Sequence, residues 1–331
     1  MKKIALTGIK PTGIPHIGNY LGAIQPALKL SESCESRYFI ADYHALNSTK
    51  DPEAIRQMSL QIAGAWLACG LDPDHSLFYK QSSVPETFEL LTILLAYTPK
   101  GLMNRAHAYK AMLQSNAEAG KDPDDGVNMG LFTYPVLMAA DILLFDPDYV
   151  PVGNDQFQHV EMAVDIAQSF NFVHKCEAFK LPEPLAHDKV KTVVGLDGRK
   201  MSKSYGNIIP IFASEKELRK LIMKIVTNSQ GVEEPKDPDC CSVFSLYKCF
   251  ASEEQIAALR ERYLAGGMGW GHAKQELFDV MNEQLAPFRE KFNHLMADPG
   301  YINDTLQKGS IKARELAAVK IRELRRILGI D

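Results

Sequence analysis

Two segments of the chain have the composition of phosphate-binding turns, and the first of them spans residues 11–19, PTGIPHIGN. It separates an apolar strand-like run from a helix-like run, so its backbone amides and the helix N-terminus could together bind phosphate. Gly18 would allow a nucleotide to approach the backbone, while His16 and Asn19 could donate hydrogen bonds to it. The alternative is an ordinary strand–helix turn with a surface histidine.

The second segment, KMSKS, occupies residues 200–204 and follows an Asp-Gly turn at residues 197–198. Its two ammonium groups and two hydroxyl groups could close on phosphate oxygens. An exposed turn has the same composition, because small polar and basic residues are common after Asp-Gly. This segment alone therefore leaves both interpretations open.

A single carboxylate, that of Asp141, lies in an otherwise apolar helical run, residues 131–145, LFTYPVLMAADILLF. Burying a carboxylate without a partner is costly, so a buried Asp141 requires a hydrogen-bond donor. Tyr134 and Met138 precede it at helical spacing and share its face. The pattern favours a ligand pocket; the alternative is an aspartate near a helix end that faces water or a lysine.

A third pattern is VPVGNDQFQH at residues 150–159, where a strand-like run ends in Gly153, Asn154 and Asp155. Asp155 could contact a ligand or simply cap the helix that follows. A metal site containing Asp155 and His159 is a further alternative. A helix-face histidine is favoured over it, because no other ligand is spaced nearby.

The composition is typical of a soluble globular protein: 331 residues, 46% hydrophobic and 24% charged, with a net charge of -4. No run of about eighteen apolar residues occurs, which predicts no membrane-spanning helix, and the N-terminal apolar run is too short for a signal peptide. The six cysteines form no CxxC pair, which predicts reduced thiols in a cytoplasmic protein. A metal cluster of Cys176, Cys240 and Cys249 is the alternative, although the ligand spacing suits it poorly.

The end of the chain is more basic than the rest. The last thirty-one residues contain seven Lys or Arg and four Asp or Glu. Such a helix could contact nucleic-acid phosphates or could present a solvated face, which charge alone favours. Arg322, Arg325 and Arg326 lie on neighbouring turns and are the candidates for phosphate contacts.

The elements that must position these residues change in character near residue 200. Before it, strand-like runs at 4–6, 38–41 and 77–79 alternate with helical patterns, which predicts a parallel sheet with ligands at the carboxyl ends of its strands. Pro26 should interrupt the first helix. After it, capping-box patterns at 214–217 and 252–255 and helical periodicity at 272–296 and 310–328 predict an all-α region.

The combination of HIGN and KMSKS in one chain resembles class I aminoacyl-tRNA synthetases, whose signatures are HIGH and KMSKS. The form ending in Asn19 looks like the tryptophanyl branch, and the resemblance covers nearly the whole chain. It implies a Rossmann-like catalytic domain at residues 1–199, then the KMSKS loop and a helical anticodon-binding domain at 200–331. It further implies ATP with Mg²⁺, L-tryptophan and tRNA(Trp) as partners, a homodimer, and no structural metal.

The resemblance also implies roles for individual residues. Those that act on the phosphates during catalysis are Lys110, Lys200 and Lys203. Those that bind ATP are Lys10, Pro11, Thr12, His16, Gly18, Asn19, Gly153, Asn154, Asp155, Val193, Lys200, Met201, Ser202, Lys203 and Ser204. Those that bind tryptophan are Leu6, Gly8, His44, Tyr134, Met138, Asp141, Val152 and Gln156. On residue type alone, Lys110 would be an exposed lysine and His44 a core histidine.

Three positions depart from the family pattern: Lys10 replaces a frequent glutamine, Leu6 a frequent aromatic residue and Asn154 a glutamate. The nearest rival is the tyrosyl branch, since a phenol also donates to a carboxylate. Met138-Ala139-Ala140 stands where tyrosyl enzymes usually have a glutamine and polar residues. A small HIGH-type nucleotidyltransferase would lack KMSKS and the helical tail, and a silent RNA-binding paralogue should have lost Lys200, Lys203 or Asp155.

Overall fold

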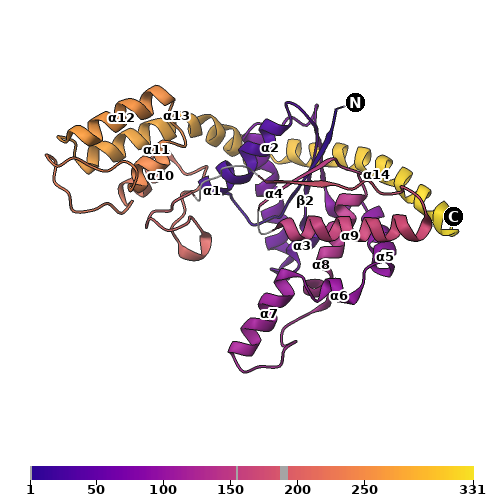
Figure 1. The fold of residues 1–331 in the computed structure, drawn as a ribbon. Coiled ribbons are helices and arrows are strands. Elements are labelled where there is room, and N and C mark those ends of the chain that lie inside the picture. The colour runs from indigo at the N-terminus through magenta and orange to yellow at the C-terminus, as the bar shows by residue number, and fades with distance from the viewer. Residues whose placement is uncertain (1, 154–155, 187–192) are drawn as a thin grey trace.

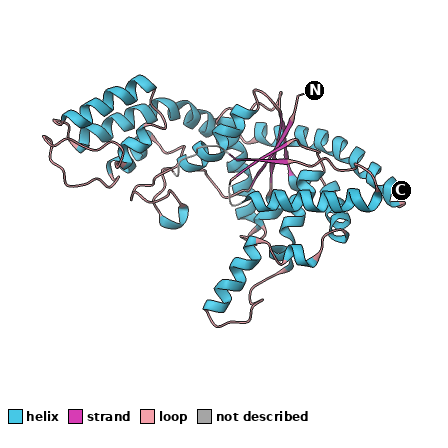
Figure 2. Ribbon diagram, in the orientation of Figure 1, coloured by secondary structure: helices cyan, strands magenta, loops and turns pink. Residues whose placement is uncertain are grey.

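The computed structural model describes residues 2–153, 156–186 and 193–331. A five-stranded sheet lies at its centre in the order β3-β2-β1-β4-β5, and its strand pairs are parallel. The strands are β1 (Ile4–Ile9), β2 (Glu35–Ile40), β3 (Leu77–Lys80), β4 (Tyr149–Val152) and β5 (Glu183–Ala186). Helices surround the sheet (Figure 2). The predicted Rossmann-like α/β fold is confirmed.

Two hydrophobic clusters cover the two faces of the sheet. Side chains alternate along a strand, so Tyr38 and Ile40 of β2 pack in one cluster and Phe39 in the other. Trp66 of α4 packs in the first cluster, while Val136 and Ile166 belong to the second. The helices of these layers are α4 (Pro52–Ala68), α5 (Glu86–Ala96), α8 (Met129–Leu143) and α9 (Phe157–His174).

The first helical segment after β1 is irregular, as Pro26 predicts. A five-residue π-helix, η1 (Tyr20–Ile24), separates α1 (Ile17–Asn19) from α2 (Gln25–Leu30). Pro26 lies in the first turn of α2, where its missing N–H removes no helical hydrogen bond. The π-helix therefore accommodates the proline, and α1 keeps its place at the end of β1.

Short elements connect these layers. They are α3 (Asp42–Ala45), η2 (Gln81–Ser83), α6 (Lys100–Met103), α7 (His107–Glu118) and η4 (Lys203–Tyr205). Helix α7 projects away from the sheet (Figure 1). None of the helices described is long and apolar enough to cross a membrane.

The chain after residue 210 is helical, as predicted. Its helices are α10 (Glu215–Met223), α11 (Ser242–Tyr247), α12 (Glu253–Ala265), α13 (Trp270–Ala297) and α14 (Gly300–Leu328). The hydroxyl of Ser214 accepts the Glu217 N–H at 3.3 Å, and Ser252 forms a reciprocal capping box with Gln255. Helices α10 to α12 and the start of α13 form a group to one side of the sheet (Figure 1).

Helix α14 returns to the sheet and packs along β3 and α5. A Cβ atom added at Gly309 would lie 1.8 Å from the backbone oxygen of Phe78, so this contact requires glycine. Ion pairs hold the helix further along, with Arg314 bound to Glu86 and Arg325 to Glu89. The final helix α14 therefore lies against the sheet region. The predicted domain boundary at residues 199/200 assigns the same helix to the helical domain.

Candidate active site

Predicted and unpredicted site residues follow the carboxyl ends of neighbouring strands. Of the predicted ones, the PTGIPHIGN turn follows β1, His44 follows β2 and Gly153 follows β4; Asp42 after β2 and Gln81 after β3 were not predicted. Because these strands are parallel and adjacent, their following segments meet at one edge of the sheet. Helix α8 supplies Asp141 to this region.

The carboxylate of Asp141 is buried, with only 3% of the residue exposed, and both of its oxygens have hydrogen-bond partners. The Nε2 atom of His44 lies 3.0 Å from Oδ2. The side-chain amide nitrogen of Gln81 lies 2.8 Å from both Oδ1 and Oδ2. The structure thus supplies the hydrogen-bond donors that the sequence required for a buried Asp141. They come from α3 and η2, the short elements that follow β2 and β3.

The pKa of Asp141 is raised above its usual value. Burial is the largest cause, because desolvation disfavours the charged form. Hydrogen bonds from His44 and Gln81 oppose this effect, and the nearby charge of Asp42 adds to it. The ionised acceptor therefore depends on the two donors that contact it.

Tyr134 lies on the same face of α8 and belongs to a second hydrogen-bonded chain. Its hydroxyl lies 2.6 Å from Nε2 of His159, and Nδ1 of His159 lies 3.0 Å from Oε1 of Gln156. Since an amide oxygen only accepts, Nδ1 carries the proton and, in the neutral ring, Nε2 accepts from the tyrosine. His159, predicted as a helix-face residue, is in fact buried between two of the predicted tryptophan-binding residues.

The remaining residues of the predicted tryptophan set lie on β1, β4 and α8. Leu6 is buried at 1% exposure in the second cluster, and Met138 and Val152 pack against that cluster. Gly8 is exposed above Phe39, and a Cβ atom there would lie 2.7 Å from the end of the Phe39 ring. Glycine at position 8 therefore lets the Phe39 ring pack directly against the backbone of β1.

On the nucleotide side, His16 and Gly18 lie in close contact. A Cβ atom at Gly18 would lie 2.9 Å from the His16 ring and 3.8 Å from Cβ of Met201. Burial, followed by the charge of Lys203, lowers the pKa of His16 to about 4, so the ring is neutral at pH 7. Its Nδ1 atom is buried and has no hydrogen-bond partner among the described residues. Asn19 accepts the His16 N–H through Oδ1 at 3.1 Å.

The KMSKS segment is held by Asn207, a buried residue that no sequence pattern singled out. Its Oδ1 accepts the Ser202 N–H at 2.8 Å, and its amide nitrogen donates to Asp197 at 2.7 Å and to the carbonyl of Lys200 at 3.1 Å. Its hydrogen bond to Asp197, with those from Arg199, lowers the pKa of Asp197 to about 2. These contacts fix the backbone of the turn that carries the two lysines. The carbonyl of Val193 accepts the N–H of Met201, the second residue of the KMSKS segment.

Two hydrogen bonds bring the KMSKS turn and the residues after it against the first signature. The Ile17 N–H donates to the Ile209 carbonyl at 2.9 Å, and Nζ of Lys203 donates to the Thr12 carbonyl at 2.5 Å. Lys200 and Ser204 are exposed, and Pro11 is buried. The structure therefore brings the two predicted ATP-binding segments together.

Four further predicted residues are placed differently or lie outside the described residues. Lys10 donates to the Ser48 hydroxyl at 2.7 Å, and burial lowers its pKa. Lys110 is exposed on the projecting helix α7, without a contact to Lys203 in the part of the chain described. Asn154 and Asp155 lie outside the described residues.

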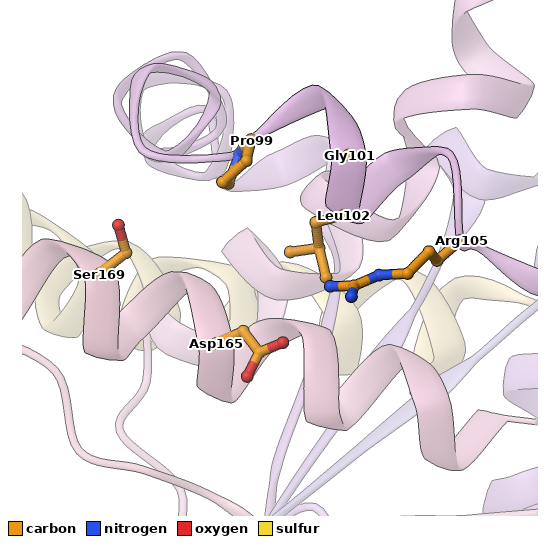
Figure 3. Close-up of a pocket in the computed structure, with 6 residues that line it drawn as sticks. All are labelled: Pro99, Gly101, Leu102, Arg105, Asp165 and Ser169. Atoms are coloured by element: carbon orange, nitrogen blue, oxygen red, sulfur yellow. The ribbon is translucent and has the colours of Figure 1, made fainter.

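The described residues contain no group of three or more His, Cys, Asp or Glu side chains placed to hold a metal ion. Cys176, Cys240 and Cys249 are free thiols. A separate cleft of about 340 Å³ lies between α6 and α9, where Leu102 and Arg105 face Asp165 and Ser169 (Figure 3). None of the predicted site residues lines it.

Comparison with known proteins separates the branches of the resembled class. The family described as tRNA synthetases class I (W and Y) matches residues 2–286. A tryptophan–tRNA ligase of Pseudomonas aeruginosa is 52% identical over 329 residues, covering 98% of this chain and 73% of that protein. One of Neisseria meningitidis is 50% identical and covers 99% and 98% of the two chains. The chain belongs to the tryptophan–tRNA ligase family.

This membership makes the chain an aminoacyl-tRNA synthetase of class I. A crystal structure of a family member agrees in fold and in length. The tryptophanyl-tRNA synthetase of Campylobacter jejuni, solved with ADP and tryptophan, has a TM-score of 0.90 and 45% identity, covering 98% of this chain and 99% of that one. The two alternatives, a tyrosyl-tRNA synthetase and a silent RNA-binding paralogue, are therefore set aside.

Proposed function

We propose that this ligase activates L-tryptophan with MgATP and transfers it to tRNA(Trp). The observation that carries the substrate assignment is the buried acceptor Asp141, held at the carboxyl end of the sheet by donors from His44 and Gln81. The indole N–H is a donor without acceptor capacity, so it matches a site whose ligand-facing group accepts. Pyrophosphate exchange with each amino acid in turn tests this assignment.

The reaction has two steps. The tryptophan carboxylate attacks the α-phosphate of ATP in line, which forms tryptophanyl-adenylate and releases pyrophosphate. A terminal ribose hydroxyl of the tRNA then attacks the acyl carbon, forms the ester and releases AMP. No protein side chain becomes a covalent nucleophile, so catalysis consists of positioning and stabilisation of developing charge. Mg²⁺ arrives with ATP and spreads the phosphate charge.

The nucleotide-side residues are proposed to act mainly on the phosphates of ATP. Lys203, close to the PTGIPHIGN turn, is proposed to neutralise charge on the departing pyrophosphate, with Lys200 and Lys110 joining when ATP is bound. His16 is neutral at pH 7, so it would donate a hydrogen bond to a phosphate oxygen through Nδ1 rather than supply charge. Gly18 lets the His16 ring lie against the backbone of the turn that is proposed to bind the nucleotide. Gly153, Asn154 and Asp155 are proposed to contact ATP because the family resemblance implies it.

Residues 1–199 are proposed as the catalytic domain and residues 200–331 as the KMSKS loop with the anticodon-binding helices. A homodimer is proposed because the resemblance implies it, and sedimentation measurements test that state. A cytoplasmic location is proposed because the cysteines at positions 34, 69, 176, 240, 241 and 249 are free thiols.

The arginines near the end of α14 differ in their ion pairs, and this difference allows a test of tRNA binding. All three arginines are exposed, but Arg325 binds Glu89 through two contacts of 2.6 and 2.7 Å, whereas Arg322 and Arg326 form no ion pair with another described residue. If tRNA phosphates bind this helix, replacing Arg322 and Arg326 with alanine should lower the salt slope of tRNA binding by about one for each phosphate that is no longer neutralised. Adenylate formation should not change.

Arg325→Ala serves as the matched control for this measurement. It removes one positive charge from the same helix, but that charge already pairs with a carboxylate, so we expect a smaller change of slope. Filter binding of tRNA(Trp) between low and physiological salt supplies the slopes. Equal slopes for wild type and the Arg322, Arg326 variant would mean that the tail is only a solvated structural helix.

A further inference from the structure

Gln81 is the polar side chain most fully enclosed near the site, with 0% of the residue exposed. The sequence around it, residues 79–84 (YKQSSV), carries no signature that marks it. Its amide nitrogen nevertheless lies 2.8 Å from both oxygens of Asp141. No other described side chain has a hydrogen bond to both of these oxygens.

The orientation of the Gln81 amide is fixed by its other end. The backbone N–H of Tyr43 donates to Oε1 of Gln81 at 3.1 Å. A flipped amide would place its nitrogen against this N–H and its oxygen against the Asp141 carboxylate, so neither hydrogen bond could form. The amide therefore presents its nitrogen, as the donor, to the carboxylate.

The backbone that carries Gln81 is held as firmly as its side chain. Gln81 begins η2 directly after β3, whose last residue, Lys80, pairs with Ile40 of β2. Helix α14 packs on β3 at Gly309, so closely that no other residue fits there. Strand, neighbouring strand and C-terminal helix together place the amide against Asp141.

The arrangement also leaves defined hydrogen-bonding capacity for a ligand. A carboxylate offers about four acceptor positions, and the hydrogen bonds from His44 and Gln81 occupy three of them. One further donor can bind, as an indole N–H would. The Gln81 amide nitrogen donates to Asp141 and its Oε1 accepts from the Tyr43 N–H, so the amide is committed to holding the acceptor.

We propose that Gln81 is a positioning residue for amino-acid specificity, whose amide holds the Asp141 carboxylate as the acceptor for the indole N–H. This inference rests on the proposed function of Asp141. If it is correct, loss of Gln81 disturbs the acceptor itself and not merely the shape of the pocket. The distinguishing signature is a dependence of tryptophan binding on pH.

Several charged or titratable groups surround Asp141 and set the direction of that dependence. His44 and Asp42 face it from α3, and Tyr79 faces it from β3. Asp42 lies 3.7 Å from Nζ of Lys80, which partly offsets its charge. Among these groups, His44 and Gln81 lower the pKa of Asp141, while burial and Asp42 raise it. Removing Gln81 therefore makes Asp141 take up a proton at higher pH.

The test measures the KM for tryptophan in pyrophosphate exchange between pH 5.5 and 9 for wild type, Gln81→Met and Gln81→Glu. In Gln81→Met, the pH below which KM rises should move upward by about one to two units, which corresponds to removal of one hydrogen bond to a charged group. Gln81→Glu should move it further, because two carboxyl groups in contact cannot both ionise easily. Ser83→Ala, in the same short helix, is the control and should leave the profile unchanged.

A structural role alone would raise KM equally at every pH, and that result in folded Gln81→Met and Gln81→Glu would overturn the inference. Thermal melting confirms that each variant is folded. Asp141→Ala separates this failure from failure of the proposed function. If Asp141→Ala leaves the KM for tryptophan unchanged, the assignment of Asp141 is wrong; if it raises KM while the Gln81 profiles match wild type, only the role of Gln81 is wrong.

Discussion

Replacing Asp141 with alanine is expected to lower kcat/KM for tryptophan by about a hundredfold, because a hydrogen bond to a charged group contributes about 1.5–3 kcal/mol. The substitution also leaves the donors of His44 and Gln81 without their acceptor in a buried site. Phenylalanine has no donor for Asp141, so its weak activation should scarcely change. Pyrophosphate exchange with both amino acids measures the two effects in one assay.

The comparison between the two substrates is the control for this prediction. A site built to hydrogen-bond a donor discriminates strongly against ligands without one, by about 10⁴–10⁵ in favourable cases. General damage to the pocket would reduce both activities together. Unchanged tryptophan activation by Asp141→Ala would place the amino-acid pocket elsewhere.

Replacing Lys203 with alanine is expected to slow adenylate formation by about ten- to a hundredfold, while the affinity for tryptophan stays close to that of wild type. Lys203 contacts the Thr12 carbonyl at 2.5 Å and lies far along the chain from the pocket residues on α8. Burial lowers the pKa of Lys203, and contact between its ammonium group and a phosphate would favour the charged form again. Its contribution should therefore appear mainly in the transition state.

Single-turnover kinetics separate the two quantities. The rate of adenylate formation at saturating ATP and tryptophan reports the chemical step, and equilibrium titration reports tryptophan binding. Arg199→Ala is a matched control from the same turn, because it removes a cation that already pairs with Asp197. If Lys203→Ala kept kcat and raised only the KM for tryptophan, the phosphate role would be contradicted.

The sequence predicted a partnered Asp141 correctly because local chemistry was sufficient: a carboxylate in an apolar helix needs a donor. It could not predict which donors, since His44 and Gln81 lie 97 and 60 residues away along the chain. Their proximity follows from the strand order, which brings the ends of β2 and β3 together. The burial of His159 could not be predicted for the same reason, because it depends on the packing of α8 against α9.

The basic tail shows a different limit. For this helix, charge composition alone favoured a solvated face over a contact with nucleic-acid phosphates. Periodicity alone cannot show that Arg314 and Arg325 pair with carboxylates of α5. Gly309 was a visible signal, since a glycine in a long helix costs stability unless something approaches closely. Its partner, the Phe78 carbonyl on β3, became evident only from the fold.

The measurement that tests the central claim most directly is ATP–pyrophosphate exchange by the wild-type enzyme with tryptophan and tyrosine at equal concentrations. Asp141 is buried and its neighbouring donors point onto it, so the site should accept the indole N–H and leave a phenol oxygen without a donor. We expect exchange with tryptophan to exceed exchange with tyrosine by at least about a thousandfold in kcat/KM. Equal exchange with the two amino acids would contradict the account, because Asp141 would then be serving a phenol as readily as an indole.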